Sequence, residues 1–264
     1  MPSMSRYWRI YRTFFSSSLA RELEFRANFF AKILQNAVWI FFFVMILLVV
    51  YGNTKSVAGW NEGDALVLAA SVFAMNAVSQ MFFFSVTEIP QMVRLGTLDF
   101  IVTKPIDSQF WVSIRKFSFD QIGSFVAGVV MLALGLQFSG VHPSAIQWIV
   151  YLALMVCSLA MFYSFTLAMM TTGIWLVRVD NLWVLAESAT QIARYPMDIY
   201  GMQIQRFFTY LVPLAFLATI PARQLVRSLD PAMAALAVLW AAISVLLARL
   251  FWRFAVTQYA SASS

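Results

Sequence analysis

The sequence is poor in charged residues and in the side chains on which most catalytic and metal sites depend. Of its 264 residues 11% are charged, and there is one histidine and one cysteine. His142 lies before Pro143 in a short turn, and no G-x-S-x-G sequence supplies a serine nucleophile. Cys157 has no second cysteine for an intrachain disulfide. We therefore expect no catalytic residue, no metal site and no redox role.

Apolar residues dominate instead. They make up 61% of the chain, and the mean hydropathy is +0.77, whereas soluble proteins carry about 25% charged residues. A helix needs roughly 20 mainly apolar residues to cross a bilayer. Runs such as 40–50 are apolar on all sides, which argues against the alternation of barrel strands. The sequence predicts an all-α polytopic membrane bundle that forms a single transmembrane domain over residues 1–264.

Six membrane spans are expected. Five are strongly apolar, at about 29–51, 65–86, 117–138, 146–177 and 232–255, and an atypical segment lies before the last of them. Residues 1–27 come first, with Arg6 and Arg9 on one helical face and Trp8 and Tyr11 on the other. This pattern predicts an amphipathic helix lying in the membrane interface.

The distribution of lysine and arginine predicts the orientation. Cations are frequent before the first span and in residues 87–116, but the loop after the first span has only Lys55. By the positive-inside rule both termini are expected in the cytoplasm. Arg223 and Arg227 depart from the pattern, because they would lie outside. The net charge of +6 is assigned to cytoplasmic flanks and lipid headgroups rather than to nucleic-acid binding.

Residues 87–107, TEIPQMVRLGTLDFIVTKPID, form the longest internal cytoplasmic connection on this topology. The segment is too apolar for an open linker, so it predicts a short helix along the membrane face. Pro90 can open such a helix and Pro105 can end it. An ordinary loop packed on its own bundle is the alternative.

Five motifs carry a family resemblance: VRLGTLDFIVTKPI, RYPMDIY, VPLAF, PARQL and YASAS. With the six spans, they make the chain resemble the membrane permease subunit of a bacterial type-2 ABC exporter, in a subfamily of small stand-alone permeases with a separate ATPase. The resemblance implies an inner-membrane location, ATP-driven export, and residues 87–107 as a coupling helix for the ATPase. The positions carried over from the family are Arg94, Gly96, Leu98, Asp99, Lys104 and Pro105.

The chain contains no G-x-x-x-x-G-K-[ST] phosphate loop. The resemblance therefore implies that a dimer of separate ATPase chains binds ATP and Mg, with no cofactor in this chain. Six spans form half of a translocation pathway, so a second permease, identical or related, is expected. A proton-coupled secondary transporter and a non-transporting assembly or scaffold protein are the alternatives.

A polar stripe marks the atypical fifth segment. Its spacing places five residues on one face of a continuous helix: Asp180, Glu187, Gln191, Arg194 and Asp198. Polar groups at membrane depth usually face a bundle interior or a wet cavity. The candidate pathway-lining residues are Asn76, Gln80, Glu187, Gln191 and Arg194. A structural ion pair, such as Arg194 with Asp198, is the alternative.

Prolines interrupt the chain between this segment and the last span. Pro196, Pro213 and Pro221 divide it into pieces that are too short to span the membrane. We expect residues 196–221 to form a re-entrant region open to the outside. Tyr195 and the three prolines are the candidate external gate, with a purely structural plug as the alternative.

Overall fold

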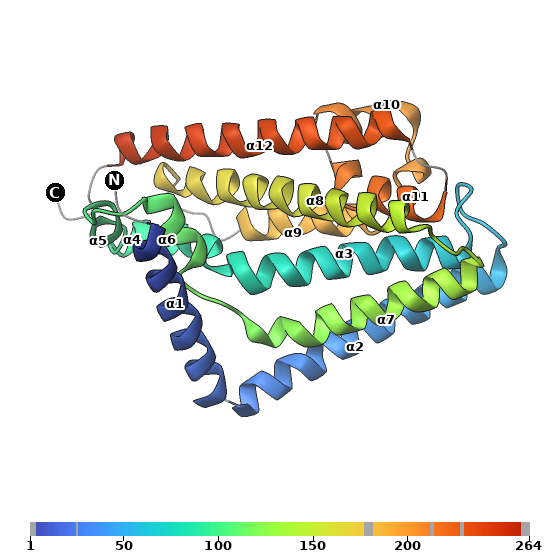
Figure 1. Ribbon diagram of the computed structural model, residues 1–264, viewed down its shortest axis with the longest axis horizontal. Coiled ribbons are helices and arrows are strands. Elements are labelled where there is room, and N and C mark those ends of the chain that lie inside the picture. Colours follow the sequence, from blue (N-terminus) through green and yellow to red (C-terminus); the bar gives the residue numbers. More distant parts are fainter. Residues whose placement is uncertain (1–3, 25, 177–181, 212–213, 228–229, 260–264) are drawn as a thin grey trace.

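The computed structural model describes residues 4–24, 26–176, 182–211, 214–227 and 230–259. Within these ranges the chain forms helices and no β-strand (Figure 1). In chain order the elements are α1 (Met4–Glu24), α2 (Arg26–Asn53), α3 (Glu62–Phe83), η1 (Phe84–Glu88), α4 (Ile89–Arg94), α5 (Asp99–Val102), α6 (Ser108–Ile114), η2 (Phe119–Gln121), α7 (Ile122–Ser139), α8 (Ala145–Thr171), η3 (Thr172–Ile174), α9 (Leu182–Ala193), η4 (Met197–Ile199), α10 (Met202–Arg206), η5 (Phe207–Leu211), η6 (Leu214–Leu217), α11 (Thr219–Val226) and α12 (Pro231–Gln258). The all-α expectation is confirmed.

Five helices in the described part of the chain are long and apolar enough to cross a membrane. They cover Ala27–Asn53, Glu62–Arg94, Phe119–Ser139, Ala145–Ile174 and Pro231–Gln258. These match the five strongly apolar spans predicted from the sequence. The sixth segment contributes α9, whose 12 residues fall short of the roughly 20 that a span needs, and residues 177–181 before it lie outside the described ranges. The count of six spans stays a prediction.

Local sequence signals set several helix ends. Ser144 and Gln147 form a capping box at the start of α8. The Asp230 carboxylate accepts hydrogen bonds from the first backbone N–H groups of α12, and Pro231 follows at the first helical position. Gly140 ends α7 with a φ of +67°, which an L side chain rarely adopts. The capped helix ends thus coincide with the ends of the apolar runs in the sequence.

The bundle is built around α3. In its apolar window 56% of the residues are buried, against 6% for α2. Helix α7 packs closely along α3, because Gly63 of α3 faces the backbone of Gly135 and Ser139, and Gly128 of α7 lies against Ala74. Small residues let two helices approach at backbone distance. The α3–α7 pair is therefore the tightest contact in the bundle.

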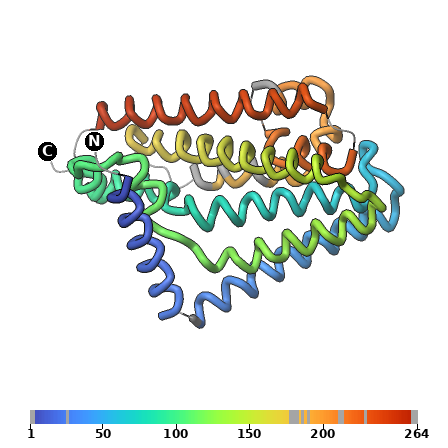
Figure 2. The backbone as a smooth tube through the Cα atoms, viewed as in Figure 1, coloured from blue at the N-terminus to red at the C-terminus, as the bar shows by residue number. Residues whose placement is uncertain are grey.

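The short elements gather at the two ends of the bundle. Helices α4, α5 and α6 lie at one end, beside the start of α1 and the end of α12 (Figure 1). Helices α10 and α11 lie at the other end, near the loop that joins α2 to α3. We call these the α4–α6 end and the α10–α11 end. Helix α1 runs obliquely outward from the α4–α6 end and meets the start of α2 at an elbow (Figure 2).

The chain between α9 and α12 turns back inside the bundle. Residues 214–217 are buried, and the Ser158 hydroxyl in the middle of α8 donates a hydrogen bond to the Phe216 carbonyl at 2.6 Å. Helix α11 then returns along α8 and α3. That residues 196–221 form a re-entrant region open to the outside stays a prediction. Pro221 sits in the first turn of α11, where its missing N–H breaks no helical hydrogen bond.

The prediction of one continuous helix through Asp198 is wrong. Helix α9 ends at Ala193, and Asp198 lies in η4 beyond Pro196. A proline ring clashes with the carbonyl four residues earlier and lacks the N–H that would continue the helix. The stripe is therefore divided between α9 and the turn after it. Asp180 lies outside the described residues.

Candidate functional site

The 87–107 segment consists of two short helices rather than the single helix expected. Helix α4 begins at Ile89, and Pro90 is its second residue, within the first turn as the sequence predicts. The chain then turns at Gly96, whose φ of +66° lies in the left-handed region that glycine adopts without strain, and α5 follows at Asp99. Gly96 is thus needed for the turn itself. Pro105 lies beyond α5, which ends at Val102.

Apolar contacts hold the segment on the end of the bundle. Ile89, Met92, Leu98 and Ile101 are buried in one cluster with α6, α8 and α12 residues, Trp252 among them. The closest approach is at Gly173 of η3, where a Cβ would lie 3.0 Å from the ring of Pro90. Such burial anchors both short helices to α8 and α12.

Exposure separates the residues carried over from the family. Arg94, Lys104 and Pro105 are exposed, whereas Leu98 is completely buried and faces the bundle. The Lys104 ammonium lies 3.9 Å from the ring centroid of Trp111, a cation–π contact. Asp99 is half-buried. Burial of the Tyr259 hydroxyl raises the pKa of Tyr259, and the nearby Asp99 carboxylate raises it further, to about 12.

Two apolar side chains that are not among the carried-over coupling positions are strongly exposed. Leu95 is 63% exposed and Phe100 is 71% exposed, on either side of the Gly96 turn. The sequence indicated them only as members of an apolar segment that needs cover, without showing which of its side chains face outward. Apolar side chains exposed beyond the ends of the spans are available for contact with another protein.

Charged pairs attach the segment to the helices that follow it. Glu88, at its start, pairs with both Arg115 and Lys116. Asp107, at its end, caps α6 by accepting from the Phe110 N–H at 2.9 Å, and it also pairs with Arg249 of α12. Both ends of the segment are therefore fastened by ion pairs.

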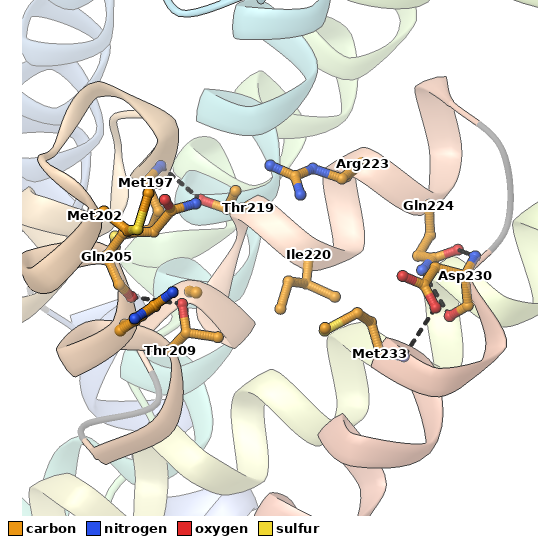
Figure 3. A pocket seen from close by; sticks show the side chains of 12 residues that line it. Met197, Met202, Gln205, Thr209, Thr219, Ile220, Arg223, Gln224, Asp230 and Met233 are labelled. Carbon is orange, nitrogen blue, oxygen red and sulfur yellow. Dashed lines mark hydrogen bonds between the residues drawn. The ribbon is translucent and has the colours of Figure 1, made fainter.

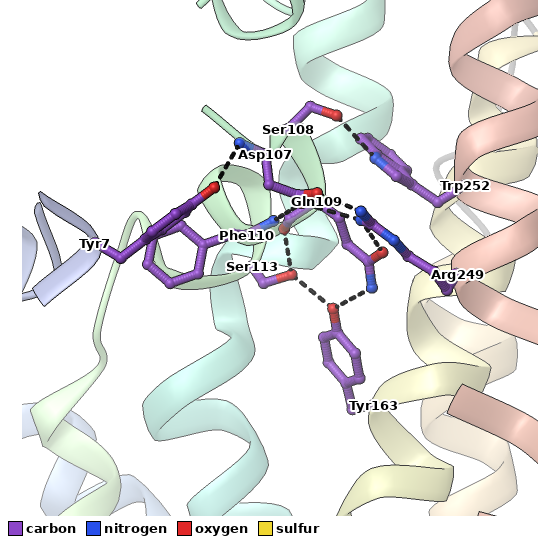
Figure 4. A network of polar contacts seen from close by, with 9 residues as sticks. All are labelled: Tyr7, Asp107, Ser108, Gln109, Phe110, Ser113, Tyr163, Arg249 and Trp252. Carbon is purple, nitrogen blue, oxygen red and sulfur yellow. Dashed lines mark hydrogen bonds and ion pairs between the residues drawn. The ribbon is translucent and has the colours of Figure 1, made fainter. Parts of the chain in front are cut away.

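Arg249 is the centre of a polar network that joins four elements (Figure 4). Besides the Asp107 carboxylate, its guanidinium donates to Gln109 Oε1 at 2.8 Å. The Gln109 amide donates to the Tyr163 hydroxyl of α8 at 3.0 Å, and the Tyr7 hydroxyl of α1 accepts from the Asp107 N–H at 3.4 Å. Hydrogen bonds thus connect residue 107 and its neighbour Gln109 to α1, α8 and α12.

Arg249→Gln should lower the melting temperature of the purified protein, because it leaves the half-buried Asp107 carboxylate without its cation. The expected loss is about 1–2 kcal/mol of unfolding free energy. Burial by itself would raise the pKa of Asp107, but hydrogen bonds from Arg249 and Phe110 bring it below its usual value. The pair of Asp107 with Arg249 therefore contributes its full stabilisation above pH 4, the ordinary aspartate pKa being about 4. This contribution is lost as the pH falls through the lowered pKa that Asp107 has in the folded protein.

Thermal unfolding in detergent between pH 3 and pH 8 measures this effect. The difference in melting temperature between wild type and Arg249→Gln should be constant at neutral pH and should decrease below about pH 4. Arg253→Gln, which alters an exposed arginine one turn along α12, is the matched control and should change little. A difference in melting temperature that is as large at pH 3 as at neutral pH would contradict a stabilising ion pair between Asp107 and Arg249.

Two of the candidate pathway residues share one face of α3. Asn76 and Gln80 lie three and seven residues after Phe73, and the Arg194 guanidinium sits 5.1 Å from the Phe73 ring centroid. Among the described residues, neither Asn76 Oδ1 nor Arg194 Nε has a hydrogen-bond partner. The structure therefore brings Asn76, Gln80 and Arg194 to the same side of α3.

Aromatic side chains border this face, and α9 carries the other two candidates. Phe43 of α2 packs edge-on against Phe73 at 5.3 Å between ring centroids and also contacts Tyr195. On α9, Glu187 is half-buried and Gln191 is exposed. The sequence did not single out Phe43 or Phe73, since aromatic residues are frequent along the whole chain.

At the α10–α11 end, Asp198 has a different partner from the Arg194 considered in the sequence. Its carboxylate pairs with Arg223 and accepts from Trp60 Nε1 at 2.8 Å. Arg227 donates to the Gly59 carbonyl at 2.8 Å. The two arginines that depart from the positive-inside pattern thus both form polar contacts within the protein at this end. Burial would raise the pKa of Asp198, but the contacts with Arg223 and Trp60 lower it.

A pocket of about 280 Å³ opens beside this network (Figure 3). Its lining includes Met197 and Gln205 from residues 196–221, Arg223 of α11 and Met233 of α12. Of the candidate gate residues, Tyr195 is exposed while Pro196 and Pro221 are buried, and Pro213 lies outside the described residues. The gate stays a prediction.

Comparison with known proteins identifies one family. Residues 37–263 match the model of the ABC-2 family transporter proteins. The match begins within α2 and includes the 87–107 segment and the last long helix, while α1 precedes it. No curated protein matches the sequence significantly.

Proposed function

The chain belongs to the ABC-2 family of transporter proteins, and from this premise we propose that it is the permease subunit of an ATP-driven exporter. A separate ATPase docks on the 87–107 segment, binds ATP and Mg, and drives the permease. The observation that carries the proposal is the construction of this segment. It exposes Leu95 and Phe100 at one end of the bundle, and ion pairs fasten its start to Arg115 and Lys116, directly after α6, and its end to α12.

The α4–α6 end is the cytoplasmic end in this proposal. Cations concentrate there, in α1, in the 87–107 segment and at positions 115, 116, 249 and 253. At the opposite end, Arg223 and Arg227 are held by Asp198 and the Gly59 carbonyl, so their charges serve contacts within the protein. The distribution favours the bacterial inner membrane with α1 and the end of α12 on the cytoplasmic side.

Movement of the ATPase reaches the spans through rigid contacts. When the ATPase subunits close on ATP, they displace Phe100 and Leu95 together with α4 and α5. Leu98 and Trp252 are completely buried in one cluster, and Arg249 binds Asp107. Packed cores transmit displacement rather than absorb it. The α8–α12 pair therefore moves with the segment.

The face of α3 that carries Asn76 and Gln80 lines the translocation pathway in this proposal, together with Arg194, Glu187 and Gln191. Unpartnered polar atoms at membrane depth are expected to face a wet cavity or a second protein chain. A second permease completes the pathway, and residues 196–221 with Tyr195 form its outer gate.

Copurification with the ATPase tests the proposed function. The neighbouring genes are searched for a phosphate-loop ATPase, and the chain is expressed together with that ATPase and isolated in detergent. A stable complex is expected, and reconstitution with the permease should raise the rate of ATP hydrolysis. Transport driven by a proton gradient alone, with no ATPase bound, would instead establish a secondary transporter. Neither ATPase binding nor transport would leave an assembly role.

A further inference from the structure

The pocket of about 280 Å³ at the α10–α11 end has two walls that come from different parts of the chain (Figure 3). One wall is the segment 197–209, which contributes Gln205 and Thr209. The other wall is α11 with the start of α12, which contributes Arg223 and Met233. The width of the pocket therefore depends on how closely the 197–209 segment lies against α11.

The two walls are attached to the bundle to different degrees. All residues of α11 except Arg223 are buried, and the helix packs along α8 and α3. The 197–209 segment is held by Met197, which is buried, and by Tyr200 and Phe208, which pack against the same apolar cluster. Residues 201–204 are exposed. Elements with few buried contacts open most readily, so α11 is the fixed wall and the 197–209 segment is the wall that can move.

Asp198 connects the movable wall to the fixed one. Its carboxylate forms an ion pair with Arg223 of α11. Trp60, which is completely buried just before α3, donates a hydrogen bond from Nε1 to the same carboxylate at 2.8 Å. The Met197 N–H also donates to the Thr219 hydroxyl of α11, at 3.4 Å, but hydrogen bonds between neutral groups are weaker than those of a carboxylate. The strongest polar attachment of the segment is therefore at Asp198.

The fixed wall attracts this carboxylate with two cations. The Arg227 guanidinium lies 4.9 Å from the ring centroid of Trp60, and the Arg223 guanidinium lies 6.0 Å from it. Arg227 is also held by the Gly59 carbonyl. Both arginines belong to the end of α11, so their positions do not depend on the 197–209 segment. Loss of the charge at Asp198 removes the attraction of both cations at once.

We propose that Asp198 is the gating residue of the α10–α11 end: its bonds to Arg223 and Trp60 hold the 197–209 segment against α11, and their release separates the two walls and widens the pocket. The inference rests on the proposed exporter only for the use of this opening, as an exit for the cargo. A carboxylate can be bound and released while both walls stay folded. The prolines considered as gate residues lack a side-chain group that could bind across the pocket.

Thiol labelling of the full chain in nanodiscs, without an ATPase, measures the separation of the walls. Met233→Cys places a thiol on the fixed wall of the pocket, in a chain whose native Cys157 is replaced by alanine. A membrane-impermeant maleimide should label this thiol about tenfold faster after Asp198→Asn, as the loss of one charge-assisted contact implies. Arg223→Gln should have the same effect and keeps the test possible if Asp198→Asn does not fold. The double variant should be labelled no faster than either single one, because both changes remove one interaction.

Two controls separate gating from a general loosening of the bundle. Asp230 lines the same pocket and caps α12, and Asp230→Asn keeps an equally good cap, so it should leave the labelling of Met233→Cys unchanged. Lys55→Cys, in the exposed loop after α2, should be labelled at one rate in every variant. Unaltered labelling of Met233→Cys by Asp198→Asn and Arg223→Gln, or an equal acceleration at Lys55→Cys, overturns the proposal. A failure to copurify an ATPase would leave these rates unaffected, so the two proposals fail separately.

Discussion

Phe100→Asp should separate the permease from its ATPase while the membrane bundle remains folded. The Phe100 ring is 71% exposed, so its replacement costs little inside this chain, but a charge in the centre of an interface is strongly unfavourable. Truncating an aromatic anchor of an interface costs about 2 kcal/mol or more, at least tenfold in affinity. Copurified ATPase and stimulated hydrolysis are the measurements, and both should fall by at least that factor.

Variants of the same segment make the result specific. Leu95→Asp should act in the same direction, and Phe100→Leu should restore most of the binding. Ile199→Asp, at an exposed apolar position near the opposite end, is the control and should keep the ATPase bound. Full ATPase binding by Phe100→Asp and Leu95→Asp together would show that the partner docks elsewhere.

Gly63→Val should destabilise the bundle more than any other single change considered for this protein. A Cβ at residue 63 would lie 2.2 Å from the Ser139 nitrogen and 2.6 Å from the Gly135 carbonyl oxygen. Both neighbours are backbone atoms of α7 and cannot turn away as a side chain would. Overpacking of this kind costs about 3 kcal/mol. The readouts are the melting temperature and the monodisperse fraction in size-exclusion chromatography.

Gly52→Val provides the matched control. Gly52 also lies near the end of a spanning helix, but a Cβ there would meet nothing within 4 Å. Its melting temperature should stay close to that of wild type. Equal stability of Gly63→Val and Gly52→Val would mean that α3 and α7 do not approach as closely as the structure shows.

Much of the secondary structure was predictable, because the local signals agree with one another. Apolar runs of sufficient length predicted the five long helices, and caps such as Ser144 and Asp230 lie where those runs begin. Pro90 predicted the start of α4. The left-handed turn at Gly96 was not predicted, since a lone glycine permits such a turn without requiring it.

The candidate site was predicted as a segment but not in its details. Leu98 was expected among the coupling positions, yet it faces the bundle, while Phe100 faces outward. The turn at Gly96 decides which side chains of α5 face the bundle. The helical spacing of apolar residues in α4 does not continue through this turn, so it could not predict that orientation. The partners of Arg249 and Asp198 lie far away in the sequence, at Asp107 and Arg223. Such pairings follow only from the packing of the spans.

The sequence by itself determined that this is a multi-pass helical membrane protein with an amphiphilic segment between two spans. Tertiary structure alone decided which span is central. Helix α2 has a higher hydropathy than α3, at 2.5 against 1.7, yet 6% of its window is buried against 56%. Lipid tails are as apolar as a protein core, so hydropathy selects the residues that leave water. Whether those residues then face lipid or another helix depends on close packing, which the glycines of α3 and α7 permit.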